Sequence, residues 1–336
     1  MRRVDSRPFC DDALVSLILG LNYELFAIML ADSRVSFSGG YSDTCLKLNL
    51  FTAAGTIGWC GDLETLEFLM ERLAPISIEA TDPWIVFDEQ RLRTTLSIDE
   101  LTACPNGIGH FIVCLIDPLK NAMGSVPQSV RMCTFGVTKT PNGYEWRHEI
   151  VPLGGYSILG SGSQIKPALD ALDVEVRTWL RPLRGKINEA GVVRRCFMLE
   201  ELVSGKLSKQ PVQSVGGLFQ MAYVLNDRVR GVSYEKWVSC GSGYGTYARM
   251  AIENGRFVQS HPPTGIRYPL FSPFRERRDI ERQKGKQFLP ELAALAPNDP
   301  GVIRETRRGP RSRLLSVHGP KMGESTYRPL IIPGHL

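Results

Sequence analysis

Short apolar runs separated by turn residues fill the first half of the chain and predict β-strands. The first two runs, residues 16–21 and 25–31, flank the turn-forming segment Asn22-Tyr23-Glu24 and predict a β-hairpin. The Asn-Gly pair at 142–143 favours a tight turn between two further antiparallel strands. In all, the pattern predicts strands over 16–21, 25–31, 46–50, 53–57, 84–87, 111–116, 131–137, 144–151, 156–159, 218–225 and 229–232, with loops over 33–44 and most of 75–107.

Apolar residues at helical spacing predict three amphipathic helices. Asp62 is placed to cap the N-terminus of the first helix, whose apolar face consists of Leu63, Leu66, Leu69, Met70 and Leu73. The second follows the Gly-Ser-Gly-Ser run at 160–163, and its core stripe consists of Ile165, Ala168, Leu169, Leu172, Val176 and Leu180. The third covers 192–202. Strands, a helix, more strands, two helices and final strands indicate an α+β fold.

The composition is that of a chain with a large buried core. Hydrophobic residues make up 43% and charged residues 22% of its 336 residues, as in ordinary globular proteins. The longest apolar run, near Phe111–Ile116, is far too short to cross a bilayer, so no membrane association is expected. The eight cysteines are scattered without a CxxC pair, and the five histidines show no ligand spacing. No metal or cofactor is therefore expected, and a reducing, cytoplasmic setting is favoured.

The net charge of +5 is unevenly distributed. From Arg256 to the C-terminus there are fifteen Lys and Arg residues and seven Asp and Glu, whereas the rest of the chain is slightly acidic. The apolar pattern fades after Lys236, apart from one charged helix predicted over 275–289, and prolines recur from 296 onwards. Residues 241–336 are therefore predicted to form a basic, partly disordered extension. It would be either a solvated segment or a contact for nucleic acid or an acidic partner.

A segment at the end of the second predicted strand stands at fixed spacings from several other polar residues. Residues 30–36 read Leu-Ala-Asp-Ser-Arg-Val-Ser, which resembles the Ala-Ala-Asp-Ser-Arg segment of proteasome β-type subunits, a family of the N-terminal-nucleophile (Ntn) hydrolases. Ser16 lies sixteen residues before the Asp of this segment, where the family's mature chain begins with a Thr. Lys47 lies fifteen residues after that Asp, one residue short of the family's Lys. The Gly-Ser-Gly-Ser run at 160–163 and the Gly-Gly pair at 216–217 also have counterparts in the family.

The resemblance implies both a fold and an activity. The fold is a four-layer αββα sandwich over residues 16–240, preceded by residues 1–15 as a leader. The activity is hydrolysis of peptide amide bonds by the first residue of the mature chain, after the leader has been removed. The hydroxyl of that residue attacks the substrate, and its own α-amino group, with an unperturbed pKa of about 7.7–8.0, takes the proton.

Carried over residue by residue, the resemblance makes Ser16 the nucleophile. Asp32 would orient Lys47, whose positive charge would lower the pKa of the Ser16 hydroxyl. Ser161 would sit beside the amine and relay protons, although it is also well placed simply to cap the following helix. The N–H of Gly58, or of the residue after it, would donate to the oxyanion.

Departures from the family pattern support an alternative, a catalytically inactive proteasome-like subunit that keeps the fold for assembly or binding. Val212 and Val215 stand where the family has an Asp and a Ser near the amine. Val15 stands where a Gly usually precedes a self-cleaving nucleophile, and without cleavage Ser16 has no free amine. Cys10, the other residue type that could begin a mature chain of this fold, lies twenty-two residues before Asp32, which is too far for this spacing.

The resemblance also implies partners. Family subunits stack through their paired helices, here 163–180 and 192–202, so self-association into a homo-oligomer is expected under both readings. A peptide is the substrate expected of the active form. The basic extension leaves nucleic acid as a further partner.

Overall fold

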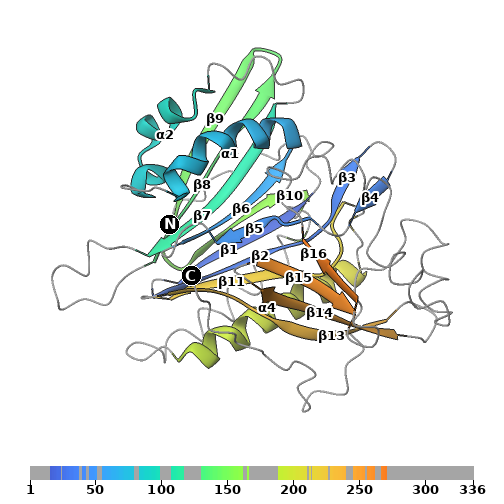
Figure 1. Ribbon diagram of the computed structural model, residues 1–336. Helices are drawn as coiled ribbons and strands as arrows, with labels where there is room; N and C mark the ends of the chain where they lie inside the picture. Colours follow the sequence, from blue (N-terminus) through green and yellow to red (C-terminus); the bar gives the residue numbers. More distant parts are fainter. Residues whose placement is uncertain are drawn as a thin grey trace.

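The computed structural model describes residues 16–23, 25–37, 40–42, 45–50, 55–78, 83–98, 107–116, 130–161, 165, 188–209, 212, 214–225, 228–239, 245–253, 256–261 and 266–270. These residues are mostly antiparallel β-sheet with few helices (Figure 1). None of the helices they form is long and apolar enough to cross a membrane. The leader 1–15 and the charged helix predicted over 275–289 lie outside these ranges. So does the second predicted helix with Leu169 and Leu172, apart from Ile165, which is buried in the core.

The first five-stranded sheet carries the N-terminal hairpin at its centre. Its order is β10 (Gly155–Gly160), β1 (Leu17–Tyr23), β2 (Phe26–Ala31), β11 (Gln220–Leu225) and β12 (Arg228–Gly231), with every neighbouring pair antiparallel. The hairpin β1–β2 predicted from the sequence is confirmed. Every residue of both strands is buried. Because both faces of these strands are covered, their sequences are continuous apolar runs rather than alternating patterns.

The second five-stranded sheet is packed on both faces. Its order is β5 (Leu48–Leu50), β6 (Gly55–Gly61), β7 (Ile108–Ile116), β8 (Val130–Thr140) and β9 (Gly143–Val151), again antiparallel throughout. Along β7, Ile112 and Cys114 belong to the apolar core shared with the first sheet. Phe111 and Val113 belong to a second core on the opposite face. This alternation follows from the two-residue period of a strand.

Helix α1 (Leu63–Ile78) covers that second core. The predicted cap is present, since Asp62 Oδ2 accepts hydrogen bonds from the Thr65 N–H at 3.0 Å and the Thr65 hydroxyl at 2.9 Å. Leu66, Leu69 and Leu73 are fully buried, as their helical spacing predicts.

Helix α4 (Glu189–Lys209) contacts β2 and β11 of the first sheet and contains the predicted helix 192–202. Its buried apolar residues, Val192, Val193, Cys196, Phe197, Leu199, Val203 and Leu207, join the core of that sheet. Figure 1 shows α1 on one side of the molecule and α4 on the other, with the two sheets between them.

Two segments differ from the sequence prediction. Residues 84–87, predicted as a strand, lie in a 3₁₀ helix (Pro83–Phe87) that leads into α2 (Glu89–Thr95). Pro83 occupies the first helical position, which needs no N–H donor. Asp88 caps α2 by accepting a hydrogen bond from the Arg91 N–H at 3.0 Å. Strand β6 does not stop at Ile57 as predicted but continues to Gly61, because its last residues pair with β7.

Strands also occur where the sequence showed little pattern. A short hairpin of β3 (Val35–Phe37) and β4 (Gly40–Ser42) lies in the predicted loop 33–44. From Tyr234 onwards, a four-stranded antiparallel sheet comprises β13 (Tyr234–Ser239), β14 (Gly245–Glu253), β15 (Arg256–His261) and β16 (Ile266–Pro269). Three of these strands belong to the segment predicted as a basic extension. Ala248, Met250 and Phe257 pack into the core of the first sheet.

Candidate active site

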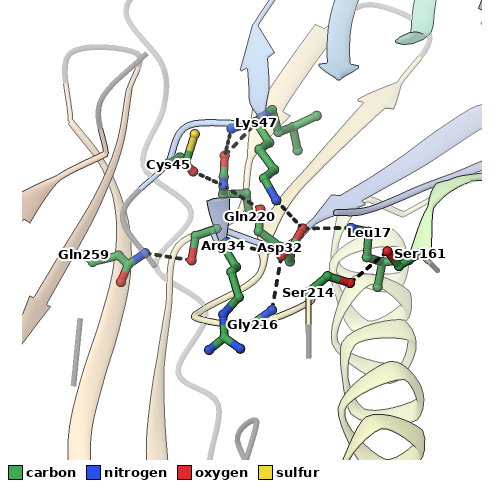
Figure 2. A network of polar contacts seen from close by, with 12 residues as sticks. Leu17, Asp32, Arg34, Cys45, Lys47, Ser161, Ser214, Gly216, Gln220 and Gln259 are labelled. Atoms are coloured by element: carbon green, nitrogen blue, oxygen red, sulfur yellow. Dashed lines mark hydrogen bonds and ion pairs between the residues drawn. The ribbon is translucent and has the colours of Figure 1, made fainter. Parts of the chain in front are cut away.

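The candidate site is built around Asp32, which follows β2 and is fully buried. Its Oδ1 accepts hydrogen bonds from the Lys47 ammonium at 2.7 Å and from the Leu17 N–H at 2.9 Å (Figure 2). Its Oδ2 accepts from the Gly216 N–H at 3.1 Å and from the Arg34 N–H at 3.2 Å. Both carboxylate oxygens are thus saturated by donors that come from four separate parts of the chain.

Asp32 and Lys47 form an ion pair with no exposed side-chain surface on either partner. Burial raises the pKa of the Asp32 carboxyl, and the Lys47 charge and the N–H donors of Leu17 and Gly216 oppose that rise. Each charge therefore depends on the other, since a buried carboxylate without its cation would be strongly unfavourable.

Ser16 reaches this pair through the backbone. It is 2% exposed and directly precedes Leu17, whose N–H is bound to Asp32. Leu17 is paired with Gly160 across β1 and β10, so Ser16 and Ser161 occupy neighbouring positions in register. Gly160 has a φ of +81°, and a Cβ there would lie 2.1 Å from the Ser16 carbonyl oxygen. Only glycine allows this approach.

Ser161, the predicted proton relay, is 7% exposed and has a partner that sequence reasoning missed. The Ser214 hydroxyl donates a hydrogen bond to Ser161 Oγ at 2.8 Å. Ser214 lies between Val212 and Val215, the apolar residues at the family's polar positions, and both valines are buried in the core. A hydroxyl therefore reaches Ser161 from a position one residue before Val215. The only signal in the sequence was a serine next to the expected position.

The structure places Gly58 apart from the turn in which the sequence prediction put it. Gly58 lies inside β6, paired with Leu48 on one side and with Ile112 on the other. A Cβ at this position would lie 2.8 Å from Ile18 Cγ2 in the first sheet. The glycine therefore allows the two sheets to approach closely. The residue after it, Trp59, uses its N–H to donate to the Lys47 carbonyl oxygen at 3.2 Å.

Two buried glutamines lie beside the ion pair, and neither carries a motif or spacing that marks it in the sequence. Gln220, at the start of β11, contacts the backbone on both sides of the ion pair. Gln259, on β15, donates a hydrogen bond from Nε2 to Ser33 Oγ at 3.1 Å. Among the described residues, no group of three or more His, Cys, Asp or Glu side chains is arranged to hold a metal ion.

Comparison with known proteins gives structural similarities only. No family model matches the chain, and no curated protein matches it. A structure described as the helical assembly of the Anbu complex from Pseudomonas aeruginosa aligns with a TM-score of 0.42 and 13% identity, over 64% of this chain and 85% of that chain. An Anbu (Gly-1) mutant from Hyphomicrobium sp. strain MC1 aligns with a TM-score of 0.39 and 14% identity, over 64% of this chain and 87% of that chain.

Proposed function

We propose that this chain is a proteasome-like Ntn hydrolase that cleaves peptide amide bonds, with Ser16 as the N-terminal nucleophile after removal of residues 1–15. The observation that carries the proposal is the buried Asp32–Lys47 pair, whose carboxylate also holds the N–H of the residue next to Ser16. The Asp32 carboxylate therefore binds both the backbone next to the candidate nucleophile and a cation that has no exposed surface.

The mechanism uses groups of this chain alone. The Ser16 hydroxyl attacks the substrate carbonyl carbon, and the free α-amine of Ser16 takes the hydroxyl proton. The amine then gives that proton to the leaving nitrogen as the C–N bond breaks, which leaves an ester on Ser16. Water hydrolyses the ester with the same amine as base. The Lys47 charge, bound to the same carboxylate oxygen as the Leu17 N–H, would favour the alkoxide character that develops on the hydroxyl. Ser161, which neighbours Ser16 in register and bonds to Ser214, would supply a hydroxyl for the amine.

For the oxyanion donor we propose Gly61 in place of Gly58. The Asp62 N–H donates to the Ile108 carbonyl oxygen of β7 at 2.7 Å. Because successive N–H groups of a strand point to opposite edges, the N–H of Gly58 also faces β7. The Gly61 N–H faces the other edge, where the Trp59 N–H meets Lys47. Gly61 has a φ of +131°, ends β6 and precedes Asp62, the cap of α1. This position supports Gly61 as the glycine of the turn that the mechanism calls for.

An inactive subunit that keeps the fold for assembly or binding is the second candidate. The observation that favours it is the burial of Val212 and Val215 where the family has polar side chains near the amine. Ser214 supplies a hydroxyl but no carboxylate in that region. The two candidates differ in one chemical fact, the presence of a free α-amine on Ser16.

The first prediction concerns that amine. Intact-mass measurement of the protein from its native source is expected to show a chain that begins at Ser16. Ser16→Ala should abolish both this processing and the hydrolysis of peptide substrates, because the attacking oxygen is gone. Ser157→Ala, which removes a half-buried hydroxyl on β10, is the matched control and should be processed normally. A wild-type chain that retains residues 1–15 would establish the inactive subunit instead.

The second prediction concerns assembly. We propose that the α1 and α4 layers enclose the two sheets as a four-layer αββα sandwich, and that subunits associate through α4 and through the helix that the sequence predicts over 163–180. Sedimentation velocity at micromolar concentration should show a homo-oligomer. The exposed Arg194 side chain on α4 is a suitable probe, and Arg194→Glu should shift the distribution towards monomer. A wild-type protein that sediments only as a monomer would contradict the proposal.

A further inference from the structure

We infer that Gln220 is a positioning residue that holds Lys47 at hydrogen-bond distance from Asp32. Its importance for catalysis rests on the proposed function. Gln220 is fully buried at the start of β11, where it pairs with Ala31, the residue before Asp32. Its side chain leaves the first sheet and reaches the segment that leads into β5 of the second sheet (Figure 2).

Every hydrogen-bonding position of the Gln220 amide is used. Oε1 accepts from the N–H groups of Lys47 and Leu48, each at 3.0 Å. Nε2 donates to the carbonyl oxygens of Cys45 at 2.8 Å and Asp32 at 3.3 Å. A primary amide offers two acceptor sites and two donors, and no other uncharged side chain of this length offers the same set. The rigid, planar group therefore joins the backbone of the cation to the backbone of its carboxylate partner.

Lys47 needs this support because it lies just outside a short edge strand. β5 has three residues and pairs, among the described strands, with β6 alone. The Lys47 carbonyl oxygen accepts from the Trp59 N–H on one side, and the Lys47 N–H donates to Gln220 on the other. With the Gln220 contact removed, a shift of about 1 Å in this segment would carry the 2.7 Å contact between Lys47 Nζ and Asp32 Oδ1 beyond hydrogen-bond distance.

The test measures how strongly the fold protects the Lys47 amine from reductive methylation. It does not require an active enzyme. Reductive methylation of the folded, full-length protein is read by mass spectrometry at Lys47 and, as an internal reference, at the exposed Lys139. Gln220→Met is compared with Val224→Ala, which alters a fully buried residue on the same strand and the same face. We expect the Lys47-to-Lys139 labelling ratio to rise about tenfold or more in Gln220→Met relative to Val224→Ala at matched global stability.

A second variant keeps the proposal testable if Gln220→Met does not fold. In Gln220→Glu, a protonated carboxyl retains an acceptor for the Lys47 N–H and a donor for the Cys45 carbonyl. Once ionised, it loses that donor and places a negative charge near Asp32. The labelling ratio of Gln220→Glu is therefore expected to match wild type at low pH and to rise with pH, while the wild-type ratio stays flat over the same range.

These outcomes separate the inference from the proposed function. Equal Lys47 labelling in Gln220→Met and Val224→Ala, or a pH-independent ratio in Gln220→Glu, would overturn the role of Gln220. A wild-type chain that keeps residues 1–15 would overturn the hydrolase proposal, and the labelling result would still decide the role of Gln220. If the hydrolase proposal and the Gln220 inference are both correct, release of residues 1–15 should be slower in Gln220→Met than in Val224→Ala.

Discussion

Replacing Lys47 by methionine is expected to destabilise the protein by about 3–5 kcal/mol at pH 8, because it leaves the buried Asp32 carboxylate without its cation. The methionine side chain has nearly the same length and shape as lysine. The loss of stability is therefore caused by removal of the charge rather than by a cavity. Urea unfolding of Lys47→Met and wild type, followed by circular dichroism, measures the difference. Lys139→Met removes an exposed lysine and should change stability by no more than about 0.5 kcal/mol.

The loss of unfolding free energy in Lys47→Met should also depend on pH. Burial raises the pKa of Asp32, and the Lys47 charge that opposes this rise is absent from the variant. The folded-state pKa then lies above the unfolded value of about 3.9, so the folded state binds the proton more tightly. The unfolding free energy of the variant consequently falls, relative to wild type, as the pH rises through the folded-state pKa. A deficit that is the same at pH 5 and pH 8 would show that no buried carboxylate is left unpaired.

Ending the chain after residue 240 is expected to abolish folding, whereas ending it after residue 270 should preserve the fold. The shorter chain loses β14–β16 and with them the buried side chains of Met250, Phe257 and Leu270. Each contributes about 1.5–3 kcal/mol by burial, so the combined loss is comparable with a typical total stability of about 5–15 kcal/mol. It also strips β13 of its partner β14 and removes the hydrogen bond from Gln259 to Ser33, next to Asp32.

Far-ultraviolet circular dichroism and urea unfolding of the two truncated chains measure this effect. A chain 1–240 that unfolds cooperatively at the wild-type midpoint would show that β14–β16 are dispensable for folding, as the predicted boundary at residue 240 implies. The chain 1–270 also tests the predicted nucleic-acid contact, because it removes most of the basic extension. If the extension binds DNA, the full-length protein should show salt-dependent retention on a DNA column, and the folded chain 1–270 should lose it.

Local physics was sufficient to predict those elements whose determinants lie close together in the sequence. The β1–β2 hairpin follows from two apolar runs around a short turn, and the β8–β9 hairpin follows from an Asn-Gly turn. The start of α1 follows from the Asp62 cap and the leucine spacing behind it. Residues 84–87 were mistaken for a strand because a short apolar run fits both structures, and the helix there depends on packing of Val86 and Leu92 in the core.

For the site, the chain's own sequence determined the residue types and the spacing of Ser16, Asp32 and Lys47. Only the tertiary structure decided what surrounds them. The Gly216 N–H that binds Asp32 is 184 positions away in sequence, and Gln220 is 173 positions from Lys47. Such contacts leave no periodic pattern, because a single side chain that crosses between two sheets has no neighbour in sequence that must match it. The pairing of strands brings these distant residues together. That pairing depends on the packing of the whole chain, so no local stretch of sequence predicts it.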